Sequence, residues 1–306
     1  MTRTVFIDGQ AGTTGLGIAT RLAAEPGMAL HVLPEMRRKS PEARREAMRR
    51  SDLTILCLPD DAAIAAVRLA DELGDEAPKL LDASTAHRTA PGWVYGFAEL
   101  WPDQPRRIAD AARVANPGCY ATAAIALLRP LTATGLVPPD HPITLQGTSG
   151  YSGGGHAMIA AHEAAGGPAF ELYALGLGHK HLPEIMAAAG LDRLPLFVPS
   201  VGHFPRGMVV TLPLHLDQLP GRVTPADLFD ALAGWYGEAA RIRVVPPDPS
   251  GRLAADALAG RDDMELSVYA NEQARLALLV ARLDNLGKGA SGAAVENARL
   301  MLGIGS

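Results

Sequence analysis

The sequence of 306 residues contains only two cysteines, Cys57 and Cys119. Two cysteines exclude the disulfide framework of a small secreted protein and are typical of a reducing compartment. No apolar run approaches the ~18 residues that a membrane-spanning helix needs. The first residues lead directly into a strand pattern and show no signal peptide. These features predict a cytoplasmic protein without a membrane partner.

Neither a strong charge excess nor repetition marks the sequence. With 28 basic and 33 acidic residues, the formal net charge is -5, which gives no indication of a nucleic-acid partner. There is no internal repeat, low-complexity tract or Gly/Ser-rich linker. A length of 306 residues is near twice the usual domain size, so we expect two domains, each with its own core.

Short apolar runs alternate with helix-like segments in the first half of the chain. Helices are expected from Gly15 to Ala24 and from Asp60 to Leu73. The apolar runs have the composition of buried strands and cover residues 5–7, 30–33, 53–58 and 80–82. Alternation of strand and helix implies a doubly wound parallel sheet of the Rossmann type.

The pattern changes at Asn116. A helix is expected from Cys119 to Leu128, ending before Pro130. Longer strands with few helices between them follow at 143–145, 196–201, 208–216, 242–245, 264–269 and 274–283. We therefore predict an α/β fold whose second domain has a mixed or antiparallel sheet with helices on one face. Spacing leaves open which domain receives the last apolar helix, which ends near Leu302.

A glycine-rich loop joins the first strand to the first helix. Gly9, Gly12 and Gly15, with Thr13 and Thr14 between them, would let the backbone turn tightly and approach a pyrophosphate at the helix N-terminus. A glycine triplet alone would equally suit an ordinary tight turn. Its position between the first strand and the first helix favours dinucleotide binding.

The segment after the second strand indicates which dinucleotide is bound. Glu35 stands where such folds often place a ribose-binding acid. Arg37, Arg38, Lys39 and Ser40 follow at once, and three cations with a hydroxyl suit a 2'-phosphate better than a bare ribose. We expect NADP, although the segment could instead be the solvated start of a basic helix.

Cys119 has the surroundings of a nucleophile. It stands at a helix N-terminus after the turn Asn116-Pro117-Gly118, where the helix dipole favours the thiolate. Cys57 lies in an apolar strand and is expected to be an inert core residue. The alternative for Cys119 is a small apolar residue that packs at the domain junction.

A candidate acid/base lies at the start of a later helix. His179, His181 and Glu184 surround Pro183, which suits a first helical turn. Residues three apart share a helical face, so Glu184 could orient the His181 imidazole, as nucleophile-plus-base chemistry requires. The pair His179 and His181 also resembles a metal site, but no further ligands are nearby, so we expect no metal. A solvated helix start is the alternative.

Several polar groups are candidates for binding an anionic substrate. Ser149 and Ser152 lie in a Gly-rich loop after a strand, where hydroxyls and backbone donors suit a phosphate or carboxylate. Arg88 and Arg206 are candidate anion clamps. A flexible surface loop and ordinary surface arginines are the alternatives.

These motifs together resemble N-acetyl-gamma-glutamyl-phosphate reductase, in its shorter type. The resemblance runs from the first strand to the last helix and is carried by the stretches 9–15, 82–88, 116–120, 178–184 and 284–292. The cysteine stretch and the last stretch are the specific ones, since many dehydrogenases share the glycine loop.

The resemblance implies a Rossmann domain of residues 1–115 and 288–306 that binds NADP, and a catalytic and oligomerisation domain of residues 116–287. Cys119 would be the nucleophile and His181 the acid/base, supported by Glu184. Further cofactor contacts would come from Ser84, Asn285, Lys288 and Gly289. Substrate contacts would come from Arg88, Ser149, Ser152, His179 and Arg206. A homodimer or homotetramer is implied.

The implied reaction is the NADPH-dependent reduction of an acyl phosphate to N-acetylglutamate semialdehyde in arginine biosynthesis, with release of phosphate. It proceeds through a thioester on Cys119, because hydride then meets a reactive thioester rather than a carboxylate. One rival is an aspartate-semialdehyde dehydrogenase, which has a similar domain plan. A non-catalytic NADP-binding regulator is another, but it would not need both Cys119 and His181.

Overall fold

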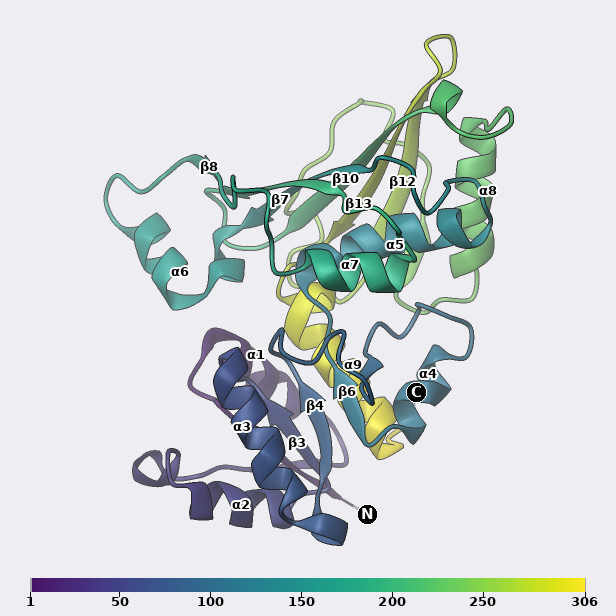
Figure 1. The fold of residues 1–306 in the computed structure, drawn as a ribbon. Coiled ribbons are helices and arrows are strands. Elements are labelled where there is room, and N and C mark those ends of the chain that lie inside the picture. Colours follow the sequence, from purple (N-terminus) through teal and green to yellow (C-terminus); the bar gives the residue numbers. More distant parts are fainter. Residues whose placement is uncertain (1, 306) are drawn as a thin grey trace. The chain divides into compact units, whose positions relative to one another are not determined.

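A computed structural model describes residues 2–305 as two compact units (Figure 1). One unit holds the chain up to Pro117 and again from Ala290, and the other holds Gly118–Gly289. The sequence analysis placed both boundaries between the units two residues earlier in the chain. Lys288 and Gly289 therefore belong to the second unit. Within the described residues, no helix is long and apolar enough to cross a membrane. The expected α/β fold class is confirmed.

The first unit is built on a six-stranded sheet in the order β2-β1-β3-β4-β6-β5, in which all neighbouring strands are parallel. Order reverses between β1 and β3, which is the feature of a doubly wound sheet. The strands are β1 (Arg3–Asp8), β2 (Met28–His31), β3 (Leu53–Leu56), β4 (Lys79–Asp82), β5 (Val94–Tyr95) and β6 (Arg113–Ala115).

Helices cover both faces of this sheet. They are α1 (Thr13–Leu22), α2 (Pro41–Arg49), α3 (Asp60–Asp71), α4 (Gln104–Asp110) and α9 (Gly292–Leu302). Val5 and Ile7 point into a core formed with α1, α4 and α9, whereas Phe6 points into the opposite core with α2 and α3. Alternate residues of one strand thus feed both cores, which explains its continuous apolar run. Figure 1 shows the yellow C-terminal helix α9 beside β4, so the last helix packs in this unit.

The second unit contains a seven-stranded mixed sheet in the order β11-β12-β13-β10-β7-β9-β8. Its pairs β11–β12 and β7–β9 are parallel and the others are antiparallel. The strands are β7 (Thr144–Gly150), β8 (Phe170–Leu172), β9 (Leu196–Gly202), β10 (Met208–His215), β11 (Ile242–Val244), β12 (Met264–Asn271) and β13 (Leu276–Leu283). The short edge strand β8 was not expected, because its three exposed residues have no burial pattern to reveal them.

Helix α5 (Cys119–Ala133) packs against both α7 (Leu182–Ala189) and α8 (Pro225–Tyr236) beside the strands (Figure 1). They bury one face of the sheet, where alternate residues of β10 and β13 such as Leu212 and Leu279 are fully covered. On the other face Pro213, Leu276 and Leu278 remain exposed. A fourth helix, α6 (Gly155–Glu163), buries only His162.

Helix α5 does not end before Pro130, as the sequence predicted, but continues to Ala133. Proline lacks the N–H that would bond to the carbonyl four residues earlier, which is that of Ala126. The hydroxyl of Tyr236 on α8 donates to this carbonyl at 3.0 Å. Because a tertiary contact satisfies the orphaned acceptor, the helix can pass through the proline.

Candidate active site

The thiol of Cys119 lies at the first residue of α5. Its N-cap, Gly118, has an extended backbone (φ -80°, ψ 150°) and provides no side-chain cap, and the thiol lies at the positive end of the helix dipole. Gly289 approaches from the other side: a Cβ there would lie 2.8 Å from the Cys119 Cβ. Only glycine allows the backbone so close to the nucleophile.

Glu184 meets the nucleophile's helix directly. Its side chain is 2% exposed, and Oε2 accepts a hydrogen bond from the Gly118 N–H at 3.1 Å. Glu184 stands three residues after His181, the N-cap of α7. The sequence predicted a role for Glu184 beside His181; the contact with Gly118, 66 residues away, was not foreseen. This contact fixes α7 and its histidine against the start of α5.

His181 is buried and neighbours a second imidazole. Its backbone N–H donates to Nδ1 of His179 at 3.1 Å, and the two rings meet edge to face at 4.6 Å. A ring nitrogen that accepts carries no proton, so a neutral His179 holds its proton on Nε2. That nitrogen lies 3.4 Å from the hydroxyl of Tyr173.

Tyr173 is a neighbour of His179 that sequence reasoning missed. Burial raises the pKa of its phenol to about 12, so it remains a hydrogen-bond donor at neutral pH. It belongs to a ring cluster with Tyr120, whose phenol pKa burial also raises and whose hydroxyl donates to the Ser200 carbonyl at 2.7 Å. The exposed segment that carries Tyr173 has little periodicity, and no sequence signal marked it.

Two predicted substrate residues of the second unit, Ser152 and Arg206, contact Asn285 and Asp284, which directly follow β13. Asn285 donates to Ser152 Oγ at 3.0 Å and accepts from the Gly207 N–H at 2.9 Å. Arg206 forms a two-point ion pair with the buried Asp284. Ser149 is buried at the end of β7, where its hydroxyl donates to the Gly150 carbonyl at 3.1 Å. Ser149, Gly150 and Ser152 of the Gly-rich loop are thus packed in the second unit, whereas Gly153 and Gly154 are exposed.

Arg88 lies in the first unit, where its Nε donates to the carbonyl of Asn116 at 3.0 Å. Ser84, a predicted cofactor residue, donates to the buried Asp82 at 2.7 Å, and the same carboxylate contacts His87 Nδ1 at 2.6 Å. These contacts order the loop after β4. Lys288, also predicted to contact cofactor, is buried in the second unit.

The glycine loop has the tightness that a dinucleotide fold needs. Gly9 has φ +89°, and a Cβ there would lie 2.2 Å from the Cys57 carbonyl oxygen. A Cβ on Gly15 would lie 2.6 Å from the Gly9 oxygen, whereas Gly12 has room. The first turn of α1, with Thr13 and Thr14, has neither a capping side chain nor an acidic residue. Its free amides can thus hold a pyrophosphate.

The basic segment after β2 is open to solvent. Arg37, Arg38 and Lys39 are exposed, and Ser40 caps α2 by accepting from the Ala43 N–H at 3.2 Å. A pair not predicted from the sequence lies beside them: Arg44 donates twice to the buried Asp8, at 2.8 and 2.6 Å. Burial raises the pKa of Asp8 despite this arginine. Since Arg44 is engaged by Asp8, the exposed cations are better placed to meet a phosphate.

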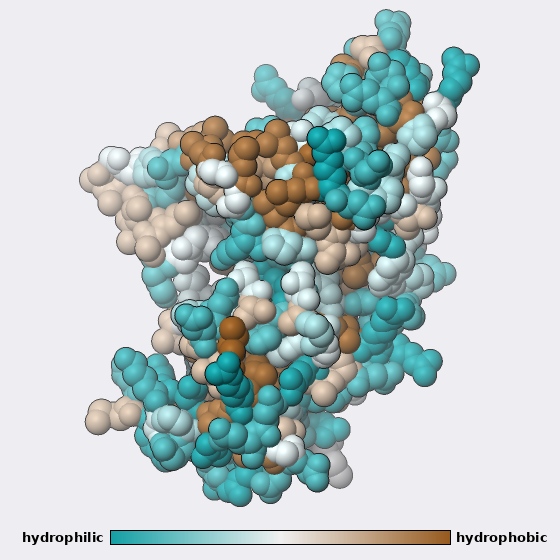
Figure 2. All heavy atoms as spheres, viewed as in Figure 1, coloured by the Kyte–Doolittle hydropathy of each residue, from teal (hydrophilic) through white to brown (hydrophobic). Residues whose placement is uncertain are grey.

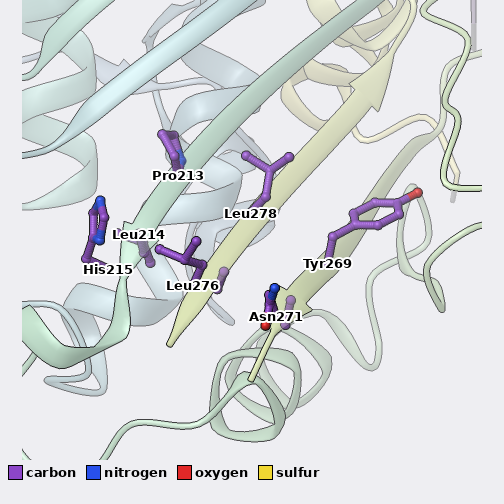
Figure 3. Close-up of a pocket in the computed structure, with 9 residues that line it drawn as sticks. Pro213, Leu214, His215, Tyr269, Asn271, Leu276 and Leu278 are labelled. Carbon is purple, nitrogen blue, oxygen red and sulfur yellow. The ribbon is translucent and has the colours of Figure 1, made fainter. Parts of the chain in front are cut away.

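A separate pocket of about 430 Å³ opens on the exposed face of the seven-stranded sheet (Figure 3). Side chains of β10, β12 and β13 line it, among them His215, Tyr269, Asn271, Leu276 and Leu278. It contains none of the predicted catalytic or binding residues. Figure 2 shows further apolar side chains gathered where β8 lies, and Phe170, Leu172, Leu175 and Leu177 are exposed there.

Comparison with known proteins relates both units to one enzyme class. Residues 119–285 match the family model described as the dimerisation domain of semialdehyde dehydrogenases. The chain is 48% identical to N-acetyl-gamma-glutamyl-phosphate reductase 2 of Pseudomonas putida, covering 99% of this chain and 97% of that protein. It is equally 48% identical to the N-acetyl-gamma-glutamyl-phosphate reductase of Brucella ovis, covering 98% of each.

Solved structures with a similar fold are aspartate semialdehyde dehydrogenases. That of Vibrio cholerae, type II in complex with ASA, gives a TM-score of 0.74 at 12% identity and covers 99% of both chains. The Candida albicans enzyme, solved with NADP, gives 0.67 at 14% identity, again over 99% of both chains. At this identity the likeness establishes the fold alone.

Proposed function

Because this chain belongs to the N-acetyl-gamma-glutamyl-phosphate reductase family, we propose that it reduces N-acetylglutamyl 5-phosphate to N-acetylglutamate 5-semialdehyde, a step of arginine biosynthesis. One observation carries the proposal: Cys119 begins α5, and Glu184 holds its N-cap at 3.1 Å while belonging to the same helical turn as His181. This arrangement supplies a nucleophile, an acid/base and the frame that holds them together.

The chemistry follows from these groups. The Cys119 thiolate attacks the acyl carbon, the carbon–oxygen bond to phosphate breaks, and phosphate leaves with the bonding electrons. Bound NADPH supplies the hydride that reduces the resulting thioester. His181 protonates the oxyanion of the thiohemiacetal and takes the proton back as the carbon–sulfur bond breaks, which returns the thiolate and releases the aldehyde.

Substrate binding is assigned to polar groups of the second unit and to Arg88. Ser149 and Ser152 would hold the substrate through the loop that packs on Asn285, and Arg206 would pair with its α-carboxylate. His179 has both ring nitrogens near protein atoms, so its part in binding would be exerted through Tyr173 and His181.

The cofactor is proposed to be NADP. The loop of Gly9, Gly12 and Gly15 would carry the pyrophosphate, and the exposed Arg37 and Arg38, with the half-buried Ser40, would carry the 2'-phosphate. Ser84, Asn285, Lys288 and Gly289 keep the cofactor roles that the family implies. The two free thiols fit a reducing cytoplasm.

We further propose a homodimer formed through the second unit. The matched family model is that of a dimerisation domain, and the uncovered sheet face exposes Pro213, Leu276 and Leu278 around the pocket of Figure 3. Light scattering of Leu278→Glu should give a monomer mass where the parent protein gives a dimer or tetramer. Equal masses for both proteins would show that this face of the sheet does not form the subunit interface.

The activity is tested in the aldehyde-oxidising direction. N-acetylglutamate semialdehyde and aspartate semialdehyde are supplied in parallel with NADP and inorganic phosphate, and NADPH formation is followed. We expect phosphate-dependent turnover with the acetylated aldehyde and little with the aspartate aldehyde, which is one methylene shorter and has a free amine. The reverse preference would favour the aspartate-semialdehyde dehydrogenase rival.

A further inference from the structure

Asp284 is a buried carboxylate for which the proposed chemistry has no use. Its side chain is 0% exposed, whereas that of Arg206, its ion-pair partner, is 36% exposed. Oδ1 accepts from Arg206 Nε at 3.3 Å, and Oδ2 accepts from Arg206 Nη2. The backbone N–H groups of Leu286, at 3.0 Å, and Gly260, at 2.7 Å, complete the set of donors. Each carboxylate oxygen of Asp284 thus accepts two hydrogen bonds, which compensates for the burial of its charge.

The ion pair holds one edge of the guanidinium. A guanidinium carries five N–H donors in a planar fork, and Asp284 binds the edge formed by Nε and Nη2. The remaining N–H groups point away from this buried acceptor, on a side chain that is still partly exposed. A second carboxylate can therefore bind Arg206 on its outer edge without displacing the first.

The backbone places this fork next to the other predicted substrate groups. A Cβ on Gly150 would lie 2.8 Å from the Arg206 nitrogen, so the loop between Ser149 and Ser152 packs directly on the turn that carries Arg206. The main chain of Asp284 contacts the segment next to the nucleophile. Its carbonyl accepts from the Gly289 N–H at 3.0 Å, and Gly289 is the residue whose backbone lies against Cys119.

We propose that Asp284 is a positioning residue that fixes the guanidinium of Arg206 to receive the α-carboxylate of the substrate. The inference rests on the proposed function, since it assumes a substrate that carries an α-carboxylate in addition to the reacting acyl group. A clamped arginine has already lost its rotamer freedom, so less entropy is lost when the substrate binds. Asp284 thereby connects Arg206, through its side chain, with Gly289 beside Cys119, through its main chain.

The test compares two aldehydes that differ in one group. N-acetylglutamate semialdehyde has the α-carboxylate, and 4-acetamidobutanal lacks it. Asp284→Asn keeps the side-chain size but removes the charge that orients Arg206. We expect its kcat/KM for the carboxylate substrate to fall ~10–100-fold, the scale of one charged hydrogen bond, mainly through KM. For 4-acetamidobutanal the change should stay within about threefold, because that substrate does not use Arg206.

Two further variants keep the test decisive. Arg206→Lys retains a cation but cannot form the two-point pair, so it should show the same substrate-selective loss even if Asp284→Asn fails to fold. The double variant should be no worse than either single one. Glu265→Gln is the matched control: Glu265 on β12 pairs with Arg282 on the neighbouring strand β13, at 2.5 Å, and its loss should affect neither substrate.

The outcomes separate the inference from the proposed function. Equal losses with both aldehydes would make Asp284 a purely structural residue and overturn the inference, as would an unchanged KM for the carboxylate substrate. If the parent enzyme does not oxidise N-acetylglutamate semialdehyde at all, the proposed function fails and the inference with it.

Discussion

The hydroxyl of Tyr236 donates to the carbonyl oxygen of Ala126 at 3.0 Å, the acceptor that Pro130 leaves without its helical partner. Both side chains that create this situation are buried. The contact joins α8 to the middle of α5, whose first residue is Cys119. The helix of the nucleophile is thus held by Glu184 at its start and by Tyr236 at its middle.

Removing this hydroxyl should destabilise the protein. Tyr236→Phe leaves the Ala126 carbonyl buried without its donor, and we expect a loss of about 1–3 kcal/mol in the free energy of unfolding measured by urea titration. In a Pro130→Ala background the restored N–H can bond to that carbonyl, so the same substitution should cost less. An equal cost in both backgrounds would show that the proline is not the reason for the contact.

Local pattern predicted much of the fold. The glycines at 9, 12 and 15 and the apolar runs of the first half depend on a few neighbouring residues, and β1, β3 and β4 were found where those runs lie. The end of α5 was predicted wrongly, because Tyr236 is 110 residues from the carbonyl that it satisfies. A helix boundary set by a tertiary contact leaves no signal in the local sequence.

The site shows the same division. Cys119 was singled out by its own turn and helix start. The contacts of Glu184 with Gly118, Arg44 with Asp8 and Arg206 with Asp284 span 66, 36 and 78 residues respectively. Such pairs exist only once the sheets have brought strand ends together, so the sequence could name the side chains but not their partners.

Cys57 should make stability fall at alkaline pH. Burial beside Asp82 and Asp8 raises the pKa of this thiol to about 12, whereas an unfolded cysteine titrates near ~8.5. The unfolded state therefore gives up its proton first, so the contribution of Cys57 is complete below pH ~8.5 and is lost as the pH rises toward 12. By pH ~10 the loss is about 2 kcal/mol.

The free energy of unfolding at pH 8 and at pH 10 measures this effect. Cys57→Ala should be less stable than the parent at the lower pH but should lose about 2 kcal/mol less between the two. If the parent and the variant decline in parallel, the Cys57 thiol is not the titrating group.

Cofactor preference should depend on the exposed cations after β2. Replacing Arg37, Arg38 and Lys39 with glutamine should weaken NADPH ~10–100-fold or more while changing NADH little, because only NADPH carries the 2'-phosphate. Fluorescence titration with both cofactors gives the ratio. Arg49→Gln with Arg50→Gln is the control, since these exposed arginines pair with Glu46 at the end of α2 and should leave the ratio unaltered. An equal loss of affinity for both cofactors would show that these residues do not bind the 2'-phosphate.

Substitution of either His181 or His179 should lower kcat, whereas loss of a direct substrate contact would mainly raise KM. His181→Asn should lower kcat ~100-fold, the usual scale for losing a general acid/base, and should remove the limb of the pH–rate profile that imidazole titration produces. His179→Asn should also act on kcat more than on KM, because His179 accepts from the His181 backbone N–H. Tyr173→Phe, which removes the hydroxyl near His179 Nε2, should give a milder version of the same change. A rise in KM alone would instead assign His179 to direct substrate binding, as the sequence first indicated.

The central claim is that Cys119 carries the acyl group, and intact-protein mass spectrometry tests it most directly. Enzyme is mixed with N-acetylglutamyl phosphate without any nicotinamide cofactor, so that acyl transfer can occur but reduction cannot. The account predicts release of phosphate, a mass increase of one N-acetylglutamyl group per chain, mapping of that group to Cys119, and its loss on addition of NADPH. Cys57→Ser should behave like the parent, and Cys119→Ser should be folded but unmodified and inactive. Full turnover by Cys119→Ser, or a parent enzyme that turns over while never acquiring the adduct, would contradict the thioester mechanism.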